Sequence, residues 1–153
     1  MLQRIQSLYL LLALACMSCL TFLPFGEILT KSSETISLGI NGFEYLKDGK
    51  TEFFSVLPLT IMLLLSVFTT LISIFLFKKR MLQIRLNVFN LIIQAGNIGL
   101  MFYFLFQANK AAGIEWSSHI TIVLPAVAVI FTYLAIRSIG KDEALVRSIS
   151  RLR

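Results

Sequence analysis

The chain has 153 residues, of which 57% are hydrophobic and only 14% are charged, whereas ordinary soluble domains are about 25% charged. This composition excludes a soluble domain. The formal net charge of +6 does not indicate a nucleic-acid partner, since the basic residues stand at the ends of apolar runs. Each of four runs is long enough to cross a bilayer, which takes about 20 apolar residues: residues 6–25, 53–77, 86–107 and 118–139. The sequence predicts an all-α integral membrane protein, a four-transmembrane-helix bundle over residues 1–140.

The first apolar run follows a short segment with one basic residue, Arg4. A cleaved signal peptide is the alternative to a retained helix, because segment 13–16 (Ala-Leu-Ala-Cys) loosely resembles a lipoprotein cleavage site. Apolar sequence continues well beyond Cys16, which favours a retained helix. Cys16 and Cys19 are interpreted as packing residues, since a metal would need further ligands and His119 is the only histidine. We expect neither a metal nor a cofactor.

Residues 26–52 form the longest polar segment and the outer loop between the first two helices. Apolar residues alternate with polar or small ones before Asn41-Gly42, and a second apolar stretch follows this pair. An Asn-Gly pair between two such stretches is the strongest short hairpin signal, and Asp48-Gly49 marks a second turn. The pattern predicts a small extracytoplasmic β-hairpin. Isolated hairpins are only marginally stable, so we expect it to cap the ends of the helices.

The basic residues predict the orientation of the bundle. Ten of the 14 Lys and Arg residues fall on one side of the predicted helices: at Arg4, in the turn 78–85 and from Arg137 onward. The four on the other side are Lys31, Lys47, Lys50 and Lys110. Cytoplasmic loops of membrane proteins carry the excess of Lys and Arg. Both termini are therefore expected in the cytoplasm.

The third run contains four carboxamides at intervals of three, four and three, so that they share one helical face: Asn87, Asn90, Gln94 and Asn97. Hydrocarbon cannot satisfy these groups, so protein or water must cover this face. The second run carries hydroxyls on one face at Ser66, Thr69, Thr70 and Ser73. In an antiparallel helix pair, facing positions have a constant sum of residue numbers. One such register pairs Ser73 with Asn90, Thr69 with Gln94 and Ser66 with Asn97, which predicts an interhelical polar stripe.

Residues 141–153 read as a basic amphipathic cytoplasmic tail. Leu145, Ile149 and Leu152 share one helical face, and the basic residues are Lys141, Arg147, Arg151 and Arg153. A basic amphipathic helix beside a membrane is expected to lie against anionic lipid, and it could also contact a cytoplasmic protein. The alternative is a solvated continuation of the fourth helix.

Three segments carry a resemblance to a known family. They are the opening Met1–Leu12, the turn containing Lys78-Lys79-Arg80 and Gln83-Ile84-Arg85, and the closing Lys141–Ser148 with Arg151-Leu152-Arg153. On these segments the chain resembles, over its whole length, a domain-of-unknown-function family of small four-helix integral membrane proteins of Bacteroidota. The resemblance implies a bacterial inner-membrane location and supplies no catalytic residues.

The sequence contains no recognisable catalytic arrangement. The predicted helices carry no acidic residue, and the chain has no glycine-rich phosphate loop, Cys/His cluster or Ser-His-Asp set. We therefore expect no enzyme activity. One hypothesis is a scaffold or accessory subunit whose tail engages anionic lipid or a protein partner. The alternative is a transporter or channel for a small polar solute lined by the Asn/Gln stripe. Because the stripe gives way to Met101 and Phe104, the scaffold is favoured.

Overall fold

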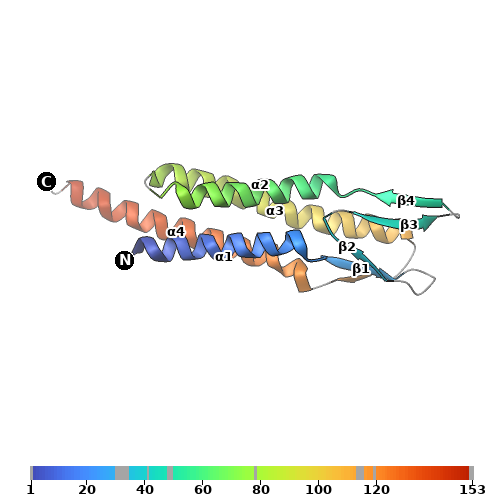
Figure 1. The fold of residues 1–153 in the computed structure, drawn as a ribbon. Helices are drawn as coiled ribbons and strands as arrows, with labels where there is room; N and C mark the ends of the chain where they lie inside the picture. Colours follow the sequence, from blue (N-terminus) through green and yellow to red (C-terminus); the bar gives the residue numbers. More distant parts are fainter. Residues whose placement is uncertain are drawn as a thin grey trace.

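The computed structural model contains four long helices, with short strands gathered at one end (Figure 1). It describes residues 2–29, 35–40, 42–47, 50–77, 79–112, 116–118 and 120–151. The elements are α1 (Leu2–Phe22), β1 (Gly26–Leu29), β2 (Thr35–Leu38), β3 (Phe43–Lys47), β4 (Lys50–Phe54), α2 (Leu57–Phe75), α3 (Arg80–Ala112), β5 (Trp116–Ser118), a 3-10 turn (Ile120–Ile122) and α4 (Val123–Arg151). Asn41, Asp48, Gly49, His119 and Arg153, which carried sequence predictions, lie outside the described residues.

The helices form a bundle in which each contacts its neighbours in sequence and α1 also contacts α4. One end holds the start of α1, the turn between α2 and α3, and the last part of α4 (Figure 1). We call it the termini end, and the opposite end, which holds β1–β5, the sheet end. All four helices are long and apolar enough to cross a membrane. Large apolar side chains such as Phe68, Ile92 and Ile130 are exposed on them. This indicates a multi-pass membrane protein.

Several helix boundaries differ from those predicted. Residues 53 and 54 belong to β4 rather than to the second helix, and α2 begins at Leu57 with Pro58 in its first turn, where a missing amide is tolerated. The third helix begins at Arg80 instead of residue 86. The fourth passes through Gly140 without a break and continues to Arg151. A glycine in a helix costs only about 1 kcal/mol, which the rest of the helix can tolerate. The described residues after Gly140 therefore continue α4, as in the second of the two alternatives for the tail, and do not form a separate surface helix.

The strands pair differently from the predicted hairpin. β1 is the centre of a three-stranded antiparallel sheet in the order β2-β1-β5, and β3 pairs with β4. Across the predicted Asn-Gly turn, the described residues form a bridge between Gly39 and Gly42, and Gly42 has a φ of 82°, which glycine adopts at little cost. Turn residues determine where the chain reverses. They do not specify the strand partner, and β2 pairs with β1 rather than with β3.

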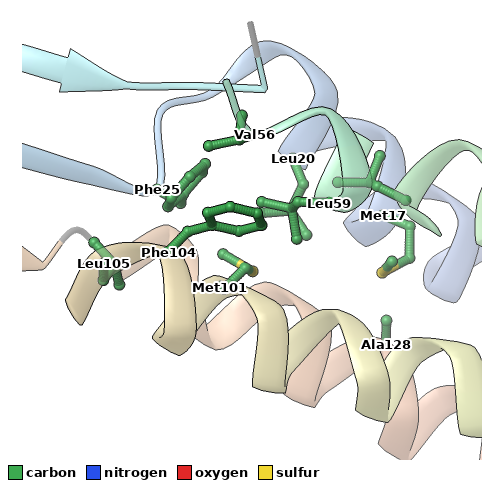
Figure 2. Packing of buried hydrophobic residues seen from close by; sticks show 10 residues of the cluster. Met17, Leu20, Phe25, Val56, Leu59, Met101, Phe104, Leu105 and Ala128 are labelled. Atoms are coloured by element: carbon green, nitrogen blue, oxygen red, sulfur yellow. The ribbon is translucent and has the colours of Figure 1, made fainter. Parts of the chain in front are cut away.

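An apolar core occupies the sheet end of the bundle (Figure 2). Its buried members come from all four helices and from the connections that follow α1 and precede α2: Met17, Leu20, Phe25, Val56, Leu59, Leu63, Met101, Phe104, Leu105 and Ala128. In Figure 2 Phe25, Val56 and Phe104 lie close together. The connecting segments are therefore anchored to the helix ends by side-chain packing.

This anchoring generates a test with a matched pair of phenylalanines. Phe25 is 1% exposed, and Phe22, the last residue of α1, is 86% exposed. We expect Phe25→Ala to lower the free energy of unfolding by about 3 kcal/mol, because it leaves a cavity between helices and strands. Phe22→Ala should change it by less than about 0.5 kcal/mol. Reversible unfolding of the purified protein in detergent measures both, and equal losses would contradict the anchoring role.

Candidate functional site

The polar side chains predicted to form a stripe lie inside the bundle. All eight are buried: Ser66, Thr69, Thr70 and Ser73 of α2, and Asn87, Asn90, Gln94 and Asn97 of α3. Two further buried side chains, Gln83 of α3 and Thr132 of α4, lie with them, as the hydrogen bonds below show. We call these ten residues the polar layer. The layer contains only hydroxyl and carboxamide groups, so its chemistry is hydrogen bonding.

Asn90 is the most fully satisfied member of the polar layer. Its Oδ1 accepts a hydrogen bond from the Ser66 hydroxyl at 2.9 Å, and its Nδ2 donates to the Thr70 hydroxyl oxygen at 2.8 Å. The Thr70 hydroxyl in turn donates to the backbone carbonyl of Ser66 at 2.8 Å. Both ends of one carboxamide are thus used by two hydroxyls spaced one helical turn apart. This contact fixes the rotation of α3 against α2.

Two other carboxamides of α3 bind the backbone of α2. Gln83 Nε2 donates to the carbonyl of Ser73 at 3.0 Å, and Asn97 Nδ2 donates to the carbonyl of Met62 at 3.3 Å. The helices approach closely near the second contact, because a Cβ on Gly96 would lie 2.9 Å from the Met62 methyl carbon. Polar contacts therefore join α2 and α3 from their connecting turn to the edge of the apolar core.

Gln94 connects α3 to the fourth helix instead. Its Oε1 accepts a hydrogen bond from the Thr132 hydroxyl of α4 at 3.1 Å. Sequence reasoning missed Thr132, a single hydroxyl in an apolar run with no pattern around it. It also missed Gln83, although Gln83 lies four residues before Asn87 and continues the spacing of the carboxamides on the same face. The polar layer thus reaches three of the four helices.

The predicted pairing register is wrong. Asn90 bonds Ser66 and Thr70 rather than Ser73, and Gln94 bonds α4. The Thr69 hydroxyl donates to the carbonyl of Leu65 in its own helix at 2.7 Å. The prediction placed the turn between residues 77 and 86, whereas α2 ends at Phe75 and α3 begins at Arg80. The tighter turn shifts each α3 residue toward an earlier part of α2.

Several buried polar atoms have no hydrogen-bond partner among the described residues: Ser73 Oγ, Asn87 Nδ2 and Oδ1, Gln94 Nε2 and Asn97 Oδ1. The bond between Thr70 and Asn90 places Ser73 and Asn87 at similar depth, since each lies three residues closer to the turn. An unsatisfied buried group costs about 1–3 kcal/mol. This part of the layer has the donors and acceptors to bind a small polar molecule such as water.

A separate polar contact joins the first and last helices at the termini end. Gln6 Nε2 donates to Asp142 Oδ2 at 2.6 Å and to the carbonyl of Ser138 at 3.3 Å. Asp142 is only 7% exposed, although it lies in the segment 141–153 that was predicted to form an amphipathic tail at the membrane surface. We call this contact the Gln6–Asp142 link. It holds the first turns of α1 against the last part of α4.

The residues predicted to contact lipid or a partner are only partly described. Lys141 is exposed on α4, beside the buried Asp142. Arg147 and Arg151 lie on the same helix, but their side chains are outside the described part of the chain. In the described ranges no group of three or more His, Cys, Asp or Glu could hold a metal ion. The described site therefore consists of the polar layer and the Gln6–Asp142 link.

Two carboxamides one turn apart provide a stability test of the polar layer. Asn90→Leu should lower the free energy of unfolding by about 1 to 2 kcal/mol, because two interhelical bonds are lost. Asn87→Leu removes a buried amide that has no partner among the described residues, so stability should be unchanged or higher. Unfolding in detergent measures both variants. If Asn87→Leu is as destabilising as Asn90→Leu, a bound molecule occupies that position.

The Gln6–Asp142 link can be measured with a double-mutant cycle. Gln6→Ala, Asp142→Ala and the double variant should show a coupling free energy of about 1 kcal/mol or more, because both side chains are buried and bonded directly. Asp142→Asn retains an acceptor oxygen and should lose less stability than Asp142→Ala. Additive effects of the two alanine substitutions would show that the link contributes nothing to stability.

Comparison with known proteins supports one part of the resemblance noted in the sequence, the membership of a domain-of-unknown-function family. A family model described as "Domain of unknown function (DUF4293)" matches residues 2–152. No curated protein matches the chain. The matched range includes all four helices, the polar layer and the Gln6–Asp142 link. The chain belongs to the DUF4293 family.

Proposed function

We propose that the protein is a non-enzymatic scaffold or accessory subunit of the bacterial inner membrane. Both termini lie in the cytoplasm, and the basic end of α4 engages anionic lipid or a cytoplasmic protein. The observation that carries this proposal is that the polar layer is enclosed by helices and ends on the apolar core. Its carboxamides hold the bundle together, which leaves the surface at the termini end to make contacts.

The closed interior supports adhesion between helices over conduction. A conduction path needs a polar lining from one side of the membrane to the other. One turn beyond Asn97, α3 contributes Met101 and then Phe104, both buried in the apolar core. Leu63 of α2 and Ala128 of α4 complete this apolar section. The polar layer therefore stops before the sheet end.

The distribution of charge supports the proposed orientation. Among the described side chains, basic ones occur just before α3, in its first two turns and in the second half of α4: Lys79, Arg80, Arg85, Arg137 and Lys141. This is the termini end of the bundle, and the positive-inside rule assigns it to the cytoplasm. Figure 1 shows α4 extending past the start of α1 at this end. The continuation of α4 is thus available to a partner or to the lipid surface.

The proposal can be tested by removing equal numbers of charges from the two ends. One full-length variant replaces Lys141, Arg147, Arg151 and Arg153 with Gln; its control replaces Lys31, Lys47, Lys50 and Lys110. Each basic residue near an anionic surface contributes about 1 kcal/mol, so the first variant should lose binding to anionic vesicles or to a stoichiometric co-purified protein by at least about tenfold. The control should retain it. Equal behaviour of the two variants would contradict the role of this end.

One observation supports the alternative function, a transporter or channel. It is the set of buried amide atoms without a partner among the described residues, in Asn87, Gln94 and Asn97. These atoms could bind a small polar solute inside the bundle. Purified protein in vesicles should show no flux of water, urea or glycerol above that of protein-free vesicles. A flux that Asn87→Leu abolishes would overturn the scaffold proposal in favour of transport.

A further inference from the structure

A groove runs between α1 and α4 near the termini end of the bundle. It is lined by Ile5 and Tyr9 of α1 and by Leu134, Arg137, Ser138 and Lys141 of α4. Arg137 and Lys141 are both exposed and lie one helical turn apart. The groove therefore presents two cations along one wall and apolar side chains beside them.

The two walls of the groove are held in place from inside the bundle. Gln6, which directly follows Ile5, donates to the carbonyl of Ser138 and to Asp142. Both acceptors belong to the same stretch of α4 as Arg137 and Lys141. Because the Gln6–Asp142 link is buried, the separation of the walls does not depend on what enters the groove. The groove is thus preformed, which reduces the entropic cost of binding.

The charge of the groove is not compensated by its described surroundings. Within the described part of the chain, Arg137 and Lys141 have no hydrogen bond or ion pair. The nearest acid in sequence, Asp142, is buried and bonded to Gln6. Two exposed cations with hydroxyl groups nearby, from Tyr9 and Ser138, form a suitable site for a phosphate group.

Apolar surface continues from the groove toward the middle of the bundle. Ile5 and Leu134 line the groove itself. Ile130 precedes Leu134 by one turn on the same face of α4, and Leu12 follows on α1; both are exposed. A ligand that fits this surface has a negatively charged end and a long apolar part. Free phosphate or a soluble sugar phosphate would leave the apolar section uncovered.

We propose that this groove binds one anionic phospholipid. Its phosphate lies between Arg137 and Lys141, the Tyr9 and Ser138 hydroxyls donate to phosphate oxygens, and an acyl chain follows Ile5 and Leu134. The inference rests on the proposed function and deepens it by assigning a lipid class and a site. The site shares Lys141 with the proposed tail contact but does not include the arginines at 147, 151 and 153, so substituting those three separates the two proposals.

The test uses full-length protein in detergent and native mass spectrometry with added phosphatidylglycerol. The wild-type protein should retain one phosphatidylglycerol per chain, and phosphatidylcholine with the same acyl chains should be retained more weakly. The double variant Arg137→Gln/Lys141→Gln should bind phosphatidylglycerol at least about tenfold more weakly. The matched control Lys79→Gln/Arg80→Gln removes the same charge at the same end but outside this groove, and it should bind like the wild type. Equal loss in the control would overturn the site.

Three further measurements separate the remaining explanations. Arg137→Lys/Lys141→Arg keeps the charges and should restore retention to within about threefold of wild type, which excludes misfolding as the cause of the loss. Excess inorganic phosphate should not displace the bound phosphatidylglycerol. If it does, the groove is a simple anion site and the proposal is overturned. The variant Arg147→Gln/Arg151→Gln/Arg153→Gln should still retain the lipid. If only that variant loses the lipid, the proposed groove site is wrong and the tail is the lipid contact.

Discussion

The bundle depends on the absence of hydrogen-bond partners in hydrocarbon. The carboxamides of the polar layer must face protein, because an unsatisfied polar group in lipid costs several kcal/mol. Asn90 meets this constraint with both ends of its amide on hydroxyls of α2, and Gln94 meets it in part through Thr132 of α4. These contacts fix which side of α3 faces inward. The exposed apolar face of the helix follows from the same rotation, with Ile92 outward where Asn90 and Gln94 are inward.

The two ends of the bundle interior are filled by different kinds of side chain. Near the sheet end, apolar side chains fill the space and anchor the connections through Phe25 and Val56. Nearer the termini end, hydroxyls and carboxamides line the contact of α2 with α3. Once helices are in a membrane, burying apolar side chains adds little driving force, because lipid is equally apolar. Hydrogen bonds with fixed geometry then specify the partners and the rotation of the helices, while packing near the sheet end attaches the parts outside the bundle.

The sequence predicted features that depend on local periodicity, and it failed where distant segments must meet. The inward face of α3 follows from the spacing of its carboxamides alone, and four apolar runs are visible from composition. The pairing register depends on the length of the turn, and nothing in the spacing showed that α3 begins at Arg80. The Gln6–Asp142 link joins residues 136 positions apart, so no local pattern could indicate it. The pairing of β2 with β1 was missed for a related reason, because turn residues and strand alternation do not specify which strands pair.

The buried position of Asp142 also contributes to the exposed positive charge of the groove. Successive residues on a helix are about 100° apart, so Lys141 and Asp142 point in different directions, one outward and the other toward α1. The helix thereby places an acid inside the bundle and leaves the neighbouring base on the surface. Gln6 provides the amide that makes this arrangement favourable, since a buried carboxyl needs a donor. One internal hydrogen bond thus positions α1, forms a wall of the groove and keeps an acidic group away from Arg137 and Lys141.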